Sequence, residues 1–224
     1  MRILFVVTGF GYGDTVRIKL LLEELKKRKN DLEAMFLGYD HSYDYFHDKY
    51  LTLKISGYNF PDSNMKFKTN RFLLKNFYLP VAWYKDYMKH KKKIEEFNPD
   101  VIISDFEPVA NLIAKKLDKK CISIFGYDHK LFEKYPDKNR NLAIQDKYIM
   151  EIYDKSDIVI VPAFKKKDDY GNVIYVSIMT DAGQNRLASK SELMAKLKLK
   201  KEPIVVMLGG SNYGVNLAKN ILKI

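Results

Sequence analysis

The sequence predicts an α/β protein with a doubly wound parallel sheet, followed by the beginning of a second α/β domain. Apolar runs alternate with helical patterns along the chain. The runs are apolar throughout, which is typical of parallel strands covered by helices on both faces. A glycine-rich loop, Gly9-Phe10-Gly11-Tyr12-Gly13, joins the first run to an amphipathic helix. Such a strand–loop–helix unit commonly opens a sheet of this class.

The elements follow from these patterns in order. Strands are expected at 3–8, 32–37, 51–55, 100–104, 121–125 and 158–161. A helix is expected over 15–29, because Ile18, Leu21, Leu22 and Leu25 share one face. A second helix is expected to run from Pro108 to Leu117, since proline fits the first helical turn.

A domain boundary is expected near residue 170. Lys165-Lys166-Lys167-Asp168-Asp169 is a charged stretch that ends at Gly171. Residues 1–170 would form a complete first domain. Residues 171–224 would begin a second, with strands at 173–176 and 204–208 and a helix from about Gly214, which is too little for an independent core.

Composition restricts the class of protein. The single cysteine, Cys121, excludes an internal disulfide and fits a reducing compartment. We read no signal peptide and no apolar run of ~18 residues, so a cytoplasmic protein without a spanning helix is expected. The formal net charge of +11 has two interpretations. It suits an anionic partner, or it reflects a lysine-rich composition found in heat-adapted proteins.

Candidate site residues lie where strands end. Ligands of such sheets bind at the carboxyl ends of the strands. Gly11 and Gly13 would let a ligand approach free helix N–H groups. Asp14 is a candidate base or a helix N-cap. Arg17, placed in the first helical turn, would bind an anion such as a diphosphate, or pair with Glu24.

Polar residues after two later strands complete this edge. Asp105 and Glu107 would bind hydroxyl groups or orient a base, or would only cap the helix that starts at Pro108. His129 has a functional and a purely structural interpretation as well.

Residues 66–93 interleave aromatic and basic side chains around the only tryptophan. Phe72, Lys75 and Trp83 suit an anionic membrane surface, where rings and ammonium groups share one face. The alternative is two helices whose aromatic faces join the core and whose lysines face water. Nucleic acid is the least favoured partner, and none is expected.

Several chemistries lack their motifs. The chain has no phosphate-binding P-loop motif, no metal motif with paired cysteines or H-E-x-x-H, and no Asp-x-Asp. The glycine loop departs from G-x-G-x-x-G, with Asp14 where a dinucleotide phosphate would sit. Asp40 after the second strand keeps a nucleotide-dependent oxidoreductase as an alternative.

Four segments together resemble GT-B glycosyltransferases, closest to MurG-like and archaeal teichoic-acid-related members. Gly11-Tyr12-Gly13-Asp14-Thr15-Val16-Arg17 resembles their G-x-G-H-x-x-R motif, with Asp14 in place of histidine. The run from Asn98 to Pro108, with Ser104-Asp105-Phe106-Glu107-Pro108, and the strand leading to His129 are similar to the segments that follow. Gly209-Gly210-Ser211 resembles the loop that opens the second, donor-binding domain.

The resemblance implies a Rossmann-like acceptor domain and transfer of a sugar from a nucleotide-sugar to an acceptor hydroxyl. It implies inversion, no cofactor and no required metal. Asp14 would be the base, and Gly209, Gly210 and Ser211 would bind the donor. The acceptor would be lipid-linked and the enzyme peripheral on the inner membrane face, with a partner chain supplying any missing donor domain. A non-catalytic membrane- or acceptor-binding subunit of a split enzyme stays an alternative.

Overall fold

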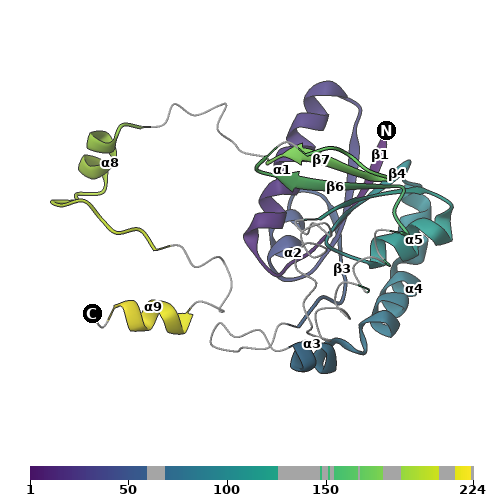
Figure 1. Ribbon diagram of the computed structural model, residues 1–224. Coiled ribbons are helices and arrows are strands. Elements are labelled where there is room, and N and C mark those ends of the chain that lie inside the picture. The colour runs from purple at the N-terminus through teal and green to yellow at the C-terminus, as the bar shows by residue number, and fades with distance from the viewer. Residues whose placement is uncertain are drawn as a thin grey trace.

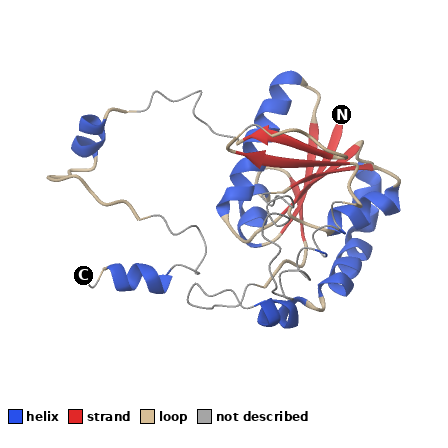
Figure 2. Ribbon diagram, in the orientation of Figure 1, coloured by secondary structure: helices blue, strands red, loops and turns tan. Residues whose placement is uncertain are grey.

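The computed structural model describes residues 1–59, 69–125, 147, 151, 154–165, 167–178, 188–206 and 215–222. Its centre is a seven-stranded parallel sheet in the order β3-β2-β1-β4-β5-β6-β7 (Figures 1 and 2). The strands are β1 (Arg2–Val7), β2 (Glu33–Gly38), β3 (Leu51–Lys54), β4 (Val101–Asp105), β5 (Lys120–Ile124), β6 (Ile158–Ala163) and β7 (Val173–Ser177). All seven were expected from the apolar runs.

Helices cover both faces of the sheet, as expected for a doubly wound fold. On one face, α1 (Tyr12–Arg28) and α2 (Asp40–Phe46) pack on Phe5 and Phe36 of the sheet. On the other, α4 (Leu79–Phe97) and α5 (Val109–Leu117) pack on Leu4 and Ile102. Figure 1 shows these two helix pairs on opposite sides of the strands. Successive side chains of β1 thus pack alternately into two separate cores. None of the described helices combines the length and apolarity needed to cross a bilayer.

The strand order reverses between β1 and β4. From β1 the chain proceeds outward through β2 and β3, then returns through α3 (Thr69–Asn76) and α4 to place β4 on the other side of β1. Val7 of β1 lies opposite Asp105 of β4 at the carboxyl end of this pair. In open α/β sheets this switch point is the usual ligand-binding edge.

The expected domain boundary is too early. β7 pairs with β6 over five residues, from Val159–Val173 to Ala163–Ser177, so it completes the first sheet. The charged stretch at 165–169 is therefore a connection between neighbouring strands. Beyond β7, α8 (Lys190–Lys196) and α9 (Val215–Ile221) lie apart from the sheet in Figure 1.

The strand expected at 204–208 does not form in its described part. Residues 204–206 are outside any strand, and Ile204 is 93% exposed. No strand in the described ranges pairs with them, and an apolar run needs such a neighbour to become a strand. The helix expected from about Gly214 is present as α9.

Candidate active site

A cluster of charged side chains lies at the switch point between β1 and β4. Asp105 ends β4, and its carbonyl accepts a hydrogen bond from the N–H of Thr8, the residue after β1, at 3.1 Å. Asp14 and Arg17 reach the same place from α1. The cluster therefore lies at the carboxyl ends of β1 and β4, where this topology favours ligand binding.

The glycine loop shapes the approach to this cluster. A Cβ on Gly9 would lie 1.7 Å from the carbonyl oxygen of Tyr39, so only glycine fits there. A Cβ on Gly11 or Gly13 would meet nothing within 4 Å, so the backbone here borders open space. The backbone of these two residues is therefore open to the approach of a ligand.

Helix α1 begins earlier than expected, and this changes two interpretations. Its N-cap is Gly11 and its first residue Tyr12, so Asp14 lies inside the first turn. Asp14 is therefore not an N-cap, although a carboxylate there still complements the helix dipole. Arg17 falls in the second turn rather than the first, where the dipole opposes a cation less.

Arg17 binds two carboxylates. Its Nε and Nη2 donate to Oδ2 and Oδ1 of Asp105 at 2.9 and 2.8 Å, a bidentate pair. Its Nη2 also contacts Oδ1 of Asp14. The expected alternative partner, Glu24, instead binds Lys27 and Arg28. A guanidinium shared in this way fixes the direction of the Asp14 side chain.

Burial changes the proton affinity of this cluster. Asp105 is fully buried, which raises its pKa to about 7, while Arg17 opposes the rise. Asp14 keeps 29% of its side chain exposed. Partial burial raises the pKa of Asp14 as well, again against the effect of Arg17. A raised pKa makes Asp14 a stronger base than an ordinary aspartate.

Glu107 is a second buried acid beside this group. Both of its carboxylate oxygens are buried without a hydrogen bond to any described residue. Burial raises its pKa to about 8; the nearby hydroxyls of Tyr39 and Thr8 oppose the rise without completing such a bond. Those two hydroxyls bond each other at 2.7 Å. At pH 7 Glu107 is therefore mostly a neutral acid.

The backbone between the two acids is strained. Phe106 has φ of +59°, a left-handed conformation that costs a non-glycine residue of order 1 kcal/mol. The Ser104 hydroxyl accepts from the N–H of Glu107 at 3.1 Å and fixes this turn. The N-cap of α5 is Pro108, without a side-chain cap. Asp105 and Glu107 thus do not cap α5, contrary to the structural alternative.

Other expected site residues fall elsewhere. His129, Gly209, Gly210 and Ser211 lie outside the described residues. Trp83 is only 5% exposed, and its Nε1 donates to the Ser56 carbonyl at 2.9 Å, so its assignment to a membrane surface is wrong. Phe72 is half-buried and stacks on Tyr58, while Lys75 is exposed.

Sequence reasoning missed the neighbours of Glu107. Thr8 and Tyr39 directly follow β1 and β2, so the rule that pointed to Asp105 could have found them. Tyr58 and Phe106 form an aromatic contact at 6.3 Å beside the acids. No pattern in the sequence predicts this contact, because it depends on the path of the loop after β3, which carries Tyr58 to Phe106.

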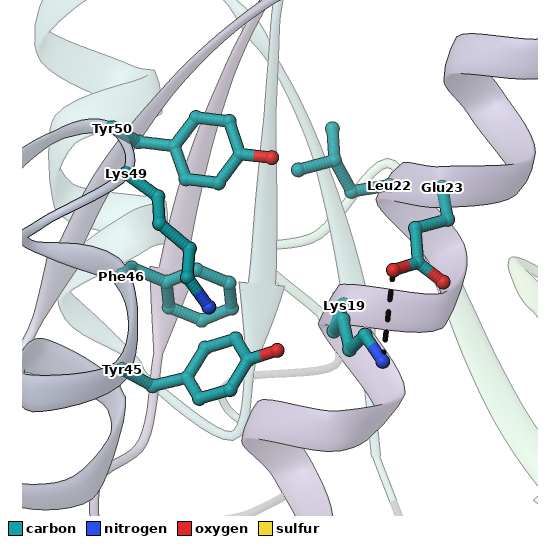
Figure 3. Close-up of a pocket in the computed structure, with 7 residues that line it drawn as sticks. All are labelled: Lys19, Leu22, Glu23, Tyr45, Phe46, Lys49 and Tyr50. Atoms are coloured by element: carbon teal, nitrogen blue, oxygen red, sulfur yellow. Dashed lines mark ion pairs between the residues drawn. The ribbon is translucent and has the colours of Figure 1, made fainter.

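A separate pocket of about 320 Å³ lies between α1 and α2 (Figure 3). Its rim carries the Lys19–Glu23 ion pair at 3.6 Å, and the ammonium of Lys49 lies 4.1 Å from the Tyr45 ring centre. None of the acids of the cluster lines it. Among the described residues, no group of three or more His, Cys, Asp or Glu is arranged to hold a metal ion.

Solved structures share this fold. Arabidopsis thaliana UGT89C1 complexed with UDP-L-rhamnose matches with a TM-score of 0.56 and 13% identity, over 90% of this chain and 55% of that chain. A Polygonum tinctorium UDP-glucosyltransferase capable of glucosylating indoxyl matches at 0.53 and 12%, over 89% and 57%. MurG of Acinetobacter baumannii matches at 0.48 and 10%, over 78% and 45%.

At these identities the likeness concerns the fold alone, and the chain spans about half the length of these proteins. No curated protein matches the sequence. A family model described as glycosyl transferase family 1 matches residues 1–161, a range that runs from β1 into β6 and contains the whole cluster. The chain therefore belongs to glycosyl transferase family 1.

Proposed function

We propose that this protein transfers a sugar from a nucleotide-sugar to an acceptor hydroxyl, with the cluster at the switch point on the acceptor side. The observation that carries this is the position of Asp14. It is partly exposed at the mouth of α1, beside open space at Gly11 and Gly13, and is held by Arg17. Family membership favours this reaction over the oxidoreductase alternative.

Asp14 would act as the general base. Its carboxylate would take the proton of the acceptor hydroxyl as the acceptor oxygen bonds to the anomeric carbon. The bond from that carbon to the donor phosphate oxygen breaks, and its electron pair leaves with the nucleoside diphosphate. We propose an inverting displacement that needs neither a metal ion nor a cofactor.

Arg17 and Asp105 would position the base. The bidentate contact fixes the guanidinium, and the guanidinium fixes Asp14. With both carboxylates ionised the three groups carry a net negative charge, so a diphosphate is repelled. We therefore favour positioning over the anion-binding role expected for Arg17. The N–H groups at Gly11 and Gly13 are better suited to an anion.

The acceptor would carry an apolar part. Phe106 lies between the two acids in sequence, and its ring contacts those of Tyr58 and Phe125. Hydroxyl-binding acids beside an aromatic surface suit an amphipathic acceptor, and we propose a lipid-linked one. Glu107 would donate to or accept from its hydroxyl groups.

The donor side would come from elsewhere. We propose that Gly209, Gly210 and Ser211 contact the donor and that further residues, in the same protein or in a partner chain, enclose the nucleotide. The support is length, because this chain covers only 57% and 55% of two solved structures of this fold. We also propose that the protein acts in the cytoplasm.

The test is release of nucleoside diphosphate from a panel of UDP-sugars by the protein from its complete reading frame, with a native lipid extract as acceptor source. We expect release that depends on the extract. Asp14→Asn should lower it by ~10²-fold or more, the scale of general-base loss. Glu24→Gln, on the same helix but outside the cluster, is the control. Equal turnover of wild type and Asp14→Asn contradicts the base role.

A further inference from the structure

The pocket between α1 and α2 lies apart from the acids of the candidate active site. Its volume, about 320 Å³, is at the lower end of the range of about 300–1,000 Å³ that is usual for small-molecule sites. Tyr50, which lines the pocket, directly precedes β3, whereas Asp105 ends β4. Because the strands are parallel, the pocket lies toward their amino ends and the acids lie at their carboxyl ends. The pocket is therefore a second, separate cavity of the fold.

One side of the pocket is an aromatic wall made of Tyr45, Phe46 and Tyr50. Phe46 is buried and stacks on Phe36 of the sheet with ring centres 4.0 Å apart. Tyr50 contacts the same Phe36 ring at 5.1 Å, and Tyr45 meets Phe46 edge to face at 5.0 Å. Figure 3 shows this wall on one side of the pocket and Leu22 of α1 on the other. Rings that the core fixes in this way offer a preformed surface to a flat apolar ligand.

The charged side chains at the aromatic wall are mostly positive. The ammonium of Lys49 lies 4.1 Å from the centre of the Tyr45 ring, a cation–π contact that keeps it at the pocket. Within the described part of the chain Lys49 makes no ion pair. On the opposite side, Lys19 pairs at 3.6 Å with Glu23, the one acid among the described residues that line the pocket. This excess of positive charge favours an anionic ligand.

The hydroxyl group of Tyr50 adds a hydrogen-bond donor. The ammonium of Lys26 lies 4.7 Å from the centre of the Tyr50 ring and donates to its hydroxyl oxygen at 3.3 Å. A hydroxyl oxygen that accepts from an ammonium group keeps its own proton for another acceptor. In Figure 3 this hydroxyl points from the aromatic wall toward Leu22. An anionic oxygen in the pocket therefore has a hydroxyl donor as well as an ammonium group to bind.

We propose that this pocket binds a small organic anion with a planar apolar ring, of the class of the aromatic carboxylates. The ring would stack against the aromatic wall, and the anionic group would lie beside Lys49. The proposal goes beyond sugar transfer and does not rest on it, because none of the acids of the cluster lines the pocket. Helix α1 carries Asp14 in its first turn and Leu22 in its middle, so the bound ligand would contact the helix that carries the proposed base.

The experiment is a titration of the full chain with 2-naphthoate at neutral pH, followed by NMR. Two comparison probes separate the contributions: 2-naphthalenemethanol has the same ring without the charge, and acetate has the charge without the ring. We expect saturable binding of 2-naphthoate and dissociation constants at least ~10-fold higher for both comparison probes. Absence of saturable binding of 2-naphthoate, or equal affinity for the neutral alcohol, overturns the proposal.

Matched variants locate the bound anion. Lys49→Gln removes an exposed ammonium group and should raise the dissociation constant of 2-naphthoate at least ~5-fold. Lys54→Gln is the control, because the Lys54 ammonium also lies over a tyrosine ring, that of Tyr43 at 5.5 Å, but outside the pocket. Tyr45→Leu should weaken binding several-fold, and Tyr43→Leu, on the same helix, should leave it unchanged. Equal effects within either pair contradict binding in this pocket.

Glu23→Gln should change the affinity in the opposite direction. It removes the acid from the pocket and leaves Lys19 without its partner, so 2-naphthoate should bind at least ~2-fold more tightly. Glu24→Gln is the control, since this neighbouring acid pairs with Lys27 and Arg28 instead. A gain in affinity cannot come from loss of folding. If Glu23→Gln binds 2-naphthoate no more tightly than Glu24→Gln, an anionic ligand is contradicted.

Discussion

At the scale of single residues, the guanidinium of Arg17 stabilises a carboxylate that has no access to water. Asp105 is fully buried, and breaking such a pair by removing one partner costs about 3–5 kcal/mol. Arg17→Met should therefore strongly lower the free energy of unfolding, and Arg17→Lys less. The raised pKa of Asp105 gives the sign of the pH dependence. Its stabilising effect is complete below the unfolded pKa of 3.8 and is lost as pH rises through about 7.

The loss in Arg17→Met should thus be smaller at pH 5.5, where Asp105 is mostly protonated, than at pH 8.5, where the variant must either hold a proton on Asp105 or bury its charge without a partner. Urea unfolding of wild type and Arg17→Met at these two pH values measures the loss in free energy of unfolding. A loss of the same size at both would show that packing, and not the charge pair, is what Arg17 supplies.

Glu107 gives a second pH-dependent prediction. Its folded pKa, about 8, lies above the ordinary value of 4.5, so the contribution of Glu107 to stability is complete below pH 4.5 and is lost as pH rises through 8. Glu107→Gln removes the buried charge and should flatten this decline by up to ~1.4 kcal/mol per pH unit within that range. The variant should be more stable than wild type at pH 8.5.

Thermal unfolding between pH 4.5 and 8.5 gives the comparison for Glu107→Gln. Glu33→Gln, at an exposed carboxyl group, is the control and should follow wild type. If the stability of Glu107→Gln changes with pH in parallel with that of wild type, then Glu107 interacts with a charged partner in the folded protein.

At the scale of elements, two glycines of the segment that joins β1 to α1 have different roles. Gly9 is needed for folding, whereas Gly13 borders the space that a ligand could enter. Gly9→Ala puts a methyl group against the Tyr39 carbonyl and should cost about 1–3 kcal/mol of stability. Gly13→Ala places its methyl group in open space inside α1, where alanine is favoured by up to ~1 kcal/mol. If a substrate approaches Gly13, this variant should lose turnover while keeping or gaining stability. Chemical unfolding together with the nucleotide-release assay shows whether the two effects separate.

The elements also show what sequence can predict. Most of the strands are apolar along their length, and β3, with the sequence LTLK, alternates; these two patterns place the strands. Helix α2 was missed because its sequence, DHSYDYF, has no apolar period. The Ser42 hydroxyl donates to the Val7 carbonyl at 2.8 Å, and Phe46 packs into the core. These two contacts hold α2 against the sheet. Those are tertiary contacts, which a local pattern does not contain.

The same reasoning explains the candidate site. Asp14, Arg17, Asp105 and Glu107 were found because residues at the carboxyl ends of parallel strands and at the following helix meet at one edge. Their pairing was not found, because Glu24 and Asp105 are equally plausible partners of Arg17 until the helix rotation is known. Composition does not tell which face of an aromatic helix is buried, so the sequence alone leaves Trp83 a candidate for a surface as well as for the core.

At the scale of the whole molecule, the strand order places the chemistry. β1 and β4 are neighbours although about a hundred residues separate them, and their carboxyl ends bring together acids from α1 and from the turn before α5. Phe72 of α3 stacks on Tyr58, and Tyr58 contacts Phe106 of the turn between β4 and α5. The acids of the switch point and this aromatic contact therefore lie at the same edge of the sheet.

We propose that Asp14 is the base for the acceptor hydroxyl, at the position where the G-x-G-H-x-x-R motif that this segment resembles has histidine. The most direct measurement is the pH dependence of turnover in the complete protein for wild type, Asp14→Asn and Asp14→His. Histidine is a base but cannot accept the hydrogen bond of Arg17 as a carboxylate does. We predict that Asp14→Asn loses ~10²-fold or more, and that Asp14→His recovers at least a tenth of the rate above a pKa near 6.5. Equal loss in both variants would contradict this account, because Asp14 would then serve only to hold Arg17.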